Sequence, residues 1–317
     1  MIVRSPALRR GVARAPLRPV PLALAALALS LAAGPPAEAY VRYKTATGLG
    51  FYWPQTCVPV SVYPASMMAA NGNMEMTTDE IVHAATAAAS AWGASMNACT
   101  FLRINVSAST EPTPRAGLDY TNNIIFRVTS WTYTDAALAI TSVFVNKKNG
   151  QIIDGDIEVN VENFAWADFD VDTHNVQDQD LQNALTHEMG HLIGLDHTCF
   201  VPSLPLPGQP TPTPAIDNTG NPVPYCDDAS PEVQATTMFA SAIPGDTAKR
   251  TLAPDDIQGV CDIYPIAADP MFCPVKDVAP PASGCSLGAS GRGGGGAALA
   301  ALAALVLAAR RRRGRRT

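Results

Sequence analysis

Basic residues are scarce over most of this 317-residue chain. Residues 40–284 contain 10 Lys and Arg against 27 Asp and Glu, a net charge of −17, whereas the whole chain carries −6. A nucleic-acid-binding surface needs clustered positive charge, so this acidity argues against nucleic acid as a partner. It suits calcium binding or a soluble exported protein.

Long apolar runs are also missing. Near the start, five arginines within residues 1–20 precede a short apolar run over 21–34 and the small-residue sequence Ala37-Glu38-Ala39. This order predicts a signal peptide over residues 1–39 that is cleaved after Ala39, and therefore export. The alternative, a membrane-spanning anchor, needs about 20 apolar residues, and this run is shorter and is followed by Pro35-Pro36.

The other end carries a second three-part signal. A glycine-rich spacer follows Ser283-Gly284-Cys285 and leads to 13 apolar residues over 297–309 and an arginine cluster. The arginines are expected to stay in the cytoplasm, and the run is so short that a transient anchor is favoured over a permanent single-pass one. Residues 285–317 resemble the MYXO-CTERM type of bacterial sorting tail. The resemblance implies a processing enzyme acting near Cys285, and delivery to the cell surface or outer membrane with membrane contact only through this tail.

Six further cysteines predict three disulfides, because an even number in an exported domain favours complete pairing. Fifteen connectivities exist for six cysteines. Proximity along the chain favours Cys57 with Cys99, Cys199 with Cys226, and Cys261 with Cys273.

An EF-hand calcium loop is excluded. Asp168, Asp170 and Asp172 alternate as at the start of such a loop. Thr173 and Gln179 stand where the loop needs glycine and glutamate. A Ca²⁺ site of another kind and a solvated acidic loop or helix cap remain the two interpretations.

Periodicity predicts a mixture of helices and strands. Capping-box spacing at Thr77 to Glu80 and apolar residues at helical period predict a helix over 78–94. His83 on this helix has no ligand partner at useful spacing, so we interpret it as a surface or packing residue. Short β-branched segments predict strands at 58–62, 101–106, 123–128, 140–145 and 152–161. In the segment 152–161, apolar and polar residues alternate, which predicts an edge strand beside a cleft. Such a strand could pair with an extended peptide.

Residues 187–197 give the strongest signal, His-Glu-Met-Gly-His-Leu-Ile-Gly-Leu-Asp-His. On a helix beginning near Asp180, His187 and His191 share one face and can reach one metal ion. The alternative is a buried amphipathic helix with satisfied core histidines. With five histidines in the chain, a chance match has an expected count on the order of 10⁻⁶, which favours the metal site.

The rest of this segment completes a catalytic arrangement. Gly194 allows the chain to turn out of the helix and bring in His197 as the third ligand. Glu188 stands beside the ligands, where a general base is needed. Three protein ligands leave the fourth position of a zinc ion to water, as in catalytic rather than structural zinc sites.

Together with Thr236-Thr237-Met238-Phe239-Ala240 and the stretch 252–264, this segment resembles the matrixin-like branch of the metzincin zinc metallopeptidases. The resemblance spans residues 51–264. It implies an α+β fold with a twisted, mostly parallel but mixed five-stranded sheet, three helices and an active-site cleft between upper and lower subdomains. The implied roles are zinc binding by His187, His191 and His197, general base and acid for Glu188, support of the site by Met238 and Gly194, and a buttress to the last helix for Asp255 and Asp256.

Several matrixin features are absent. Thr198 replaces the usual serine after the third histidine, and no tyrosine follows Met238 closely enough to be an extra ligand. Only His83 and His174 remain outside the segment, too few for the structural zinc of animal matrixins. We expect no cysteine-switch propeptide, because only about 11 residues separate Tyr40 from the first strand-like segment. The expected cofactor is therefore one catalytic Zn²⁺.

These observations predict a catalytic domain over 40–270 with a proline-rich insertion at 199–226, a linker at 271–284 and the tail at 285–317. The expected function is a secreted or surface-attached zinc endopeptidase that cleaves internal bonds of extended proteins or peptides. Its specificity pocket is expected between the zinc helix and the segment after Met238. The alternatives are an inactive surface adhesin that retains the zinc fold and a zinc amidase acting on cell-wall peptides.

Overall fold

The computed structural model describes residues 40–68, 76–111, 114–171, 175–202 and 213–274, which belong to one unit ending at Pro274. The predicted signal peptide and sorting tail, Asp172, His174 and the middle of the proline-rich insertion lie outside the described residues. Within the described ranges, no helix is both long and apolar enough to span a membrane.

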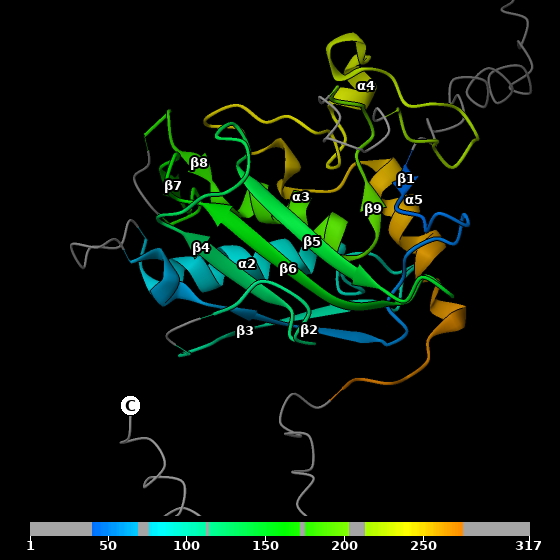
Figure 1. Cartoon of the computed structure of the whole chain (residues 1–317), viewed down its shortest axis with the longest axis horizontal. Helices are drawn as coiled ribbons and strands as arrows, with labels where there is room; N and C mark the ends of the chain where they lie inside the picture. The colour runs from blue at the N-terminus through cyan, green and yellow to red at the C-terminus, as the bar shows by residue number, and fades with distance from the viewer. Residues whose placement is uncertain (1–39, 69–75, 112–113, 172–174, 203–212, 275–317) are drawn as a thin grey trace, which may run out of the picture. The chain divides into compact units, whose positions relative to one another are not determined.

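A five-stranded mixed sheet forms the framework, with strand order β3-β2-β4-β6-β5 (Figure 1). β2 pairs in parallel with β3 and β4, β4 pairs in parallel with β6, and β5 runs antiparallel to β6. The strands are β2 (Cys57–Val62), β3 (Arg103–Ala108), β4 (Asn123–Arg127), β5 (Ala139–Val145) and β6 (Ile152–Asn160). Two short pairs lie outside this sheet: β1 (Val41–Arg42) with β9 (Leu195–Asp196), and β7 (Trp166–Ala167) with β8 (Gln179–Asp180).

The prediction that residues 152–161 form an edge strand is wrong. β6 lies inside the sheet, and β5 is the edge strand. The alternating polar side chains of β6 are buried because loops cover that face. Asp154 accepts backbone N–H bonds from Asp119 and Tyr120, and Asp156 accepts one from Gly117. Alternating polar residues in a strand normally face solvent. In β6 they face a loop and accept hydrogen bonds from its backbone N–H groups.

The helices agree with the predicted positions. Thr77 and Glu80 form the expected capping box at the start of α2, which ends at Trp92 rather than Ala94 because Gly93 caps it. The elements are α2 (Thr78–Trp92), α3 (Leu181–Leu192), α4 (Pro231–Gln234) and α5 (Pro254–Ile263), with single 3₁₀ turns η1 (Pro64–Met67), η2 (Cys226–Asp228), η3 (Ala248–Arg250) and η4 (Ile266–Ala268). The prediction of an α+β fold with a mixed five-stranded sheet and few helices is confirmed.

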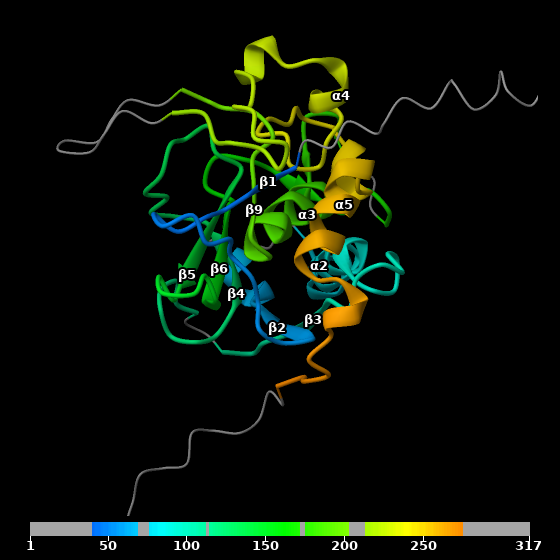
Figure 2. The same ribbon diagram turned by 90° about the vertical axis from the view of Figure 1, so that its right-hand side faces the viewer.

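Helices α2 and α3 pack against one face of the sheet. They lie behind it in Figure 1, and the view turned by 90° in Figure 2 shows both on the same side. Trp92 joins the two helices, since its buried indole N–H donates to the carbonyl of Thr186 at 2.7 Å. The apolar core between helices and sheet includes Leu185 and Ile157, both fully buried. This packing fixes α3, the helix that carries the histidines.

Three disulfides are present, as predicted, but two of the predicted pairs are wrong. The bonds join Cys57 to Cys273, Cys99 to Cys261, and Cys199 to Cys226. Only the last pair follows proximity along the chain. The other two join residues 216 and 162 positions apart in sequence, because the start of β2 meets the segment after η4, and the turn before β3 meets α5, only in the folded structure. Such bonds are typical of domains that fold in an oxidising compartment.

Candidate metal centre

Three histidine side chains converge where α3 ends. His187 and His191 project from α3, and His197 follows β9. The Nε2 atom of His197 lies 3.1 Å from Nε2 of His187 and 3.0 Å from Nε2 of His191. Nitrogens of a tetrahedral site with bonds of about 2.0–2.1 Å lie roughly 3.3 Å apart. The structure therefore brings the three predicted ligands into a metal-binding arrangement.

Backbone carbonyls orient two of these rings. Nδ1 of His187 donates to the carbonyl of Thr237 at 2.7 Å, and Nδ1 of His191 donates to that of Leu195 at 2.9 Å. A neutral imidazole carries one N–H, so both Nε2 atoms present lone pairs toward His197. His197 can donate its single proton to only one of them. A cation among the three nitrogens would relieve the remaining repulsion, so the donor set fits a metal ion.

The turn after α3 depends on glycine at position 194. Gly194 has φ of 99°, in the region that favours glycine, and a Cβ there would lie 2.7 Å from the carbonyl oxygen of Phe51. The chain can therefore reverse directly after the helix and return to His197 through β9. This agrees with the turn predicted from the sequence.

Burial keeps the three imidazoles neutral. It lowers the pKa of His191 to about 4 and that of His187 and His197 well below the ordinary value, and the positive charge of Lys249 adds to the effect. Removal of water disfavours the charged form of a histidine. Neutral imidazoles are the form that binds metal, so the site is ready for an ion at neutral pH.

Glu188 lies beside the ligands with one carboxylate oxygen held in place. The hydroxyl of Thr141, on β5, donates to Oε2 of Glu188 at 2.6 Å. Burial raises the pKa of Glu188 to about 7, whereas the Thr141 hydrogen bond and the charge of Lys249 oppose this shift. A carboxyl group with a pKa near neutrality can both accept and return a proton.

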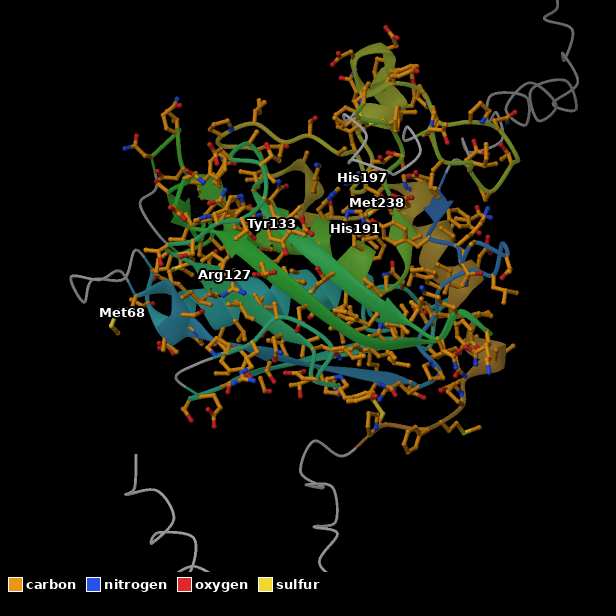
Figure 3. The ribbon with its side chains drawn as sticks, viewed as in Figure 1. Met68, Arg127, Tyr133, His191, His197 and Met238 are labelled. Atoms are coloured by element: carbon orange, nitrogen blue, oxygen red, sulfur yellow. A yellow bond between two sulfur atoms is a disulfide. The ribbon has the colours of Figure 1, made fainter. Side chains whose placement is uncertain are left out.

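Met238 packs directly under α3. Its side chain is 1% exposed, and its sulfur would lie 2.2 Å from a Cβ at Gly190, so these two positions are in close contact. Figure 3 shows Met238 beside His191 and His197, behind β5. Asp256 on α5 fixes the segment, because its carboxylate accepts the backbone N–H groups of Thr237 at 2.7 Å and Met238 at 3.3 Å. Asp256 also accepts the backbone N–H of Ala253, the N-cap of α5, at 3.1 Å, so it caps the last helix as expected and joins that helix to the Met238 segment.

We expect Gly190→Ala to destabilise the protein and lower its metal affinity. The added methyl would meet both the Met238 sulfur and, at 2.8 Å, the ring of Trp92, so one of them must move. Overpacking of this kind costs about 1–3 kcal/mol. Thermal unfolding and metal titration would measure both effects. Gly93→Ala is the matched control, because the same added methyl would lie 3.6 Å or more from its nearest neighbours. An unchanged Gly190→Ala variant would contradict the packing described.

A cavity of about 270 Å³ opens beside the histidines. Its walls come from residues at and just before the start of β5, from α3 and from the segment after Met238. The lining residues besides the site itself are Ala136 to Ile140, Asn183, Ala184, Ala240 to Ala242 and Lys249. Thr141 and Lys249 were not predicted as site residues, because neither lies within a recognisable motif.

Two of the acidic residues considered for calcium, Asp168 and Asp170, have side-chain partners in the structure. Nδ1 of His83 lies 2.5 Å from a buried carboxylate oxygen of Asp168, a pair that no spacing in the sequence indicated. Arg250 forms ion pairs with Asp170 and Asp180. His83, Asp168 and Asp170 could converge on an ion, but Arg250 forms an ion pair with Asp170 and lies 3.7 Å from Asp168, so its charge already offsets these carboxylates. A calcium site here stays a prediction.

Comparison with known proteins gives no assignment. No protein-family description matches the chain, and no curated protein matches it. Solved structures that match include the GM1-bound form of the ECX AB5 holotoxin, with 13% sequence identity and a TM-score of 0.40 over 73% of this chain and 91% of that chain. A likeness at this TM-score supports no argument about fold family or function.

Proposed function

We propose that the protein is a zinc-dependent endopeptidase of the matrixin-like metzincin type, which cleaves internal peptide bonds of extended proteins. The observation that carries the proposal is the convergence of three neutral histidine nitrogens beside a buried glutamate at an open cavity. Three protein ligands are the pattern of a catalytic rather than a structural zinc. The five-stranded mixed sheet with α2 and α3 on one face is compatible with the metzincin fold.

In this proposal the three histidines, Glu188 and Thr141 have separate roles in catalysis. His187, His191 and His197 would hold Zn²⁺, which when bound supplies a Lewis acid that activates water and polarises the substrate carbonyl. Glu188 takes a proton from the attacking water and delivers it to the leaving amine. Its carboxylate is buried beside the histidines and held by Thr141, which places it for both steps. Thr141 keeps the carboxylate aimed at the reacting atoms.

The edge of β5 is the proposed platform for the substrate. β5 ends the sheet, and no strand among the described residues pairs with its outer edge. It also contributes Ala139 and Ile140 to the cavity wall, so a peptide paired with this edge would pass over the metal centre. An exposed edge can bind an extended peptide through backbone hydrogen bonds. Pairing with an extended peptide, which the sequence analysis expected of residues 152–161, is therefore proposed for β5 instead.

Export and surface delivery belong to the same proposal. The three disulfides favour folding outside the cytoplasm, and the signal peptide and sorting tail predicted from the sequence would supply the route. The two alternatives are an inactive adhesin and a cell-wall amidase. A buried, hydrogen-bonded Glu188 beside the histidines favours an active enzyme over an adhesin.

A casein zymogram tests the proposal and separates it from both alternatives. We expect the purified protein to clear casein, a zinc chelator to abolish clearing, and added Zn²⁺ to restore it, because the ion is the only group proposed to polarise the carbonyl. An amidase would leave casein intact but cleave cell-wall peptides in a chelator-sensitive way. Absence of both activities in metal-loaded protein would favour the adhesin.

A further inference from the structure

Lys249 is a buried cation at the wall of the cavity. Its side chain belongs to η3, is 6% exposed and lines the cavity together with His187 and Glu188. The ammonium group donates to the carbonyl oxygens of Phe239 at 2.6 Å and Ser241 at 2.7 Å. An ammonium group has three N–H donors, so one remains for another acceptor.

The position of Lys249 is fixed by the neighbouring helix. Its backbone N–H donates to the side-chain oxygen of Asn183, on α3, at 2.7 Å within the buried region. Asn183 itself lines the cavity, four residues before His187. The lysine is therefore anchored to the same helix as the metal ligands, and its ammonium group has a set place relative to them.

This lysine lacks the anionic partner that buried charges usually have. Arg127 is paired with Glu158, and Arg250 with Asp180. Among the described residues, no carboxylate forms an ion pair with Lys249 within 4.0 Å. Burial lowers the pKa of Lys249 to about 8, which still leaves the amine mostly protonated at pH 7. The carboxylates of Asp246, Glu188 and Asp256 favour this charge electrostatically, but none forms an ion pair with it, and a buried charge without a contacting partner is costly unless it serves a ligand.

The remaining cavity wall cannot supply that partner. Alanines at 136, 137, 139, 184, 240 and 242 form much of it, and these short side chains leave the space open. The only carboxylate in the lining is Glu188, which is held by Thr141 and is assigned to proton transfer. The cavity therefore has space for an anionic side chain of a substrate, and Lys249 is the cationic group that could bind it.

We infer that Lys249 determines specificity by binding the carboxylate of an Asp or Glu side chain directly after the scissile bond. The inference rests on the proposed peptidase function. The substrate strand along β5 would direct that side chain into the cavity, where the free N–H of Lys249 donates to it. Hydrogen bonds between charged groups are stronger than neutral ones. Replacement of the substrate carboxylate by an amide should lower kcat/KM by about 10- to 100-fold.

The test uses peptides that differ only in the residue after the cut: Glu, Gln, Leu, Asp or Asn. Wild-type protein should cleave the Glu and Asp peptides about 10- to 100-fold more efficiently than the Gln and Asn peptides. Lys249→Met should reduce that ratio to about one and favour the Leu peptide, whereas Lys249→Arg should keep an acidic preference. Lys148→Met is the matched control, since Lys148 is exposed in a distant turn, and it should behave as the wild type.

The outcomes separate the two proposals. Equal cleavage of Glu and Gln peptides by the wild type would overturn the role of Lys249 and leave the peptidase function intact. Failure to cleave any peptide, with Zn²⁺ bound, would reject the peptidase function and this inference with it. If Lys249→Met unfolds, as circular dichroism would show, the wild-type ratio and the Lys249→Arg variant still decide the question.

Discussion

Glu188→Ala is expected to abolish peptide hydrolysis while the protein keeps its metal. The orientation of His187 and His191 depends on the carbonyls of Thr237 and Leu195, not on Glu188, so the ligands should stay in place. Loss of a general base and acid lowers the rate by about 10²- to 10⁴-fold. Measurement of kcat/KM on a fluorogenic peptide, with metal content by elemental analysis, gives both quantities.

Two variants control this experiment. Glu188→Gln keeps the shape and a hydrogen bond to Thr141 but cannot accept the proton, so it should be as inactive as the alanine variant. Glu232→Ala changes an exposed glutamate on α4 and should retain full activity. Near-wild-type hydrolysis by metal-loaded Glu188→Ala, with contaminating protease excluded, would refute the assigned mechanism.

Asp256→Ala should weaken both the fold and the metal site. The carboxylate accepts three backbone N–H groups, those of Thr237, Met238 and Ala253. Buried donors left without partners cost about 1–3 kcal/mol each, so the free energy of unfolding should fall by about 3 kcal/mol or more. Thr237 also accepts the Nδ1–H of His187, and so Asp256 supports a metal ligand through one residue. Loss of such outer support lowers metal affinity by roughly 10- to 100-fold.

Denaturant unfolding and competition with a metal-binding dye would measure these two effects. Asp228→Ala is the control, because Asp228 is exposed and, among the described residues, its carboxylate forms no hydrogen bond with the Met238 segment. If Asp256→Ala lost stability but bound metal normally, the hydrogen bond from His187 to the Thr237 carbonyl would not depend on Asp256. Normal stability would contradict the described hydrogen bonds altogether.

Features encoded by neighbouring residues were predictable from the sequence. The helix over 181–192, the glycine turn at 194 and the spacing of His187, His191 and His197 all follow from local geometry within residues 181–197. The capping box at Thr77 is equally local. The strand segments also lie where β-branched residues indicated, because backbone preference and burial agree there.

Features that depend on distant contacts were not predictable. The alternation in β6 could not show that loop amides would cover its acidic face, so the edge was assigned to the wrong strand. Proximity along the chain could not indicate disulfides between cysteines that only the fold brings together. Lys249 lies 52 residues beyond His197 in sequence, and only the fold brings it to the cavity wall.

X-ray absorption at the zinc edge, on protein purified without added metal, tests the central claim most directly. We predict about one Zn²⁺ per chain, with three imidazole nitrogens at roughly 2.0–2.1 Å and one further light-atom ligand that exogenous anions displace. His191→Ala should lose the signal, since Nε2 of His191 belongs to the converging set. A chain that binds no zinc, or binds it through four protein ligands with no exchangeable position, would contradict a catalytic metal centre at this site.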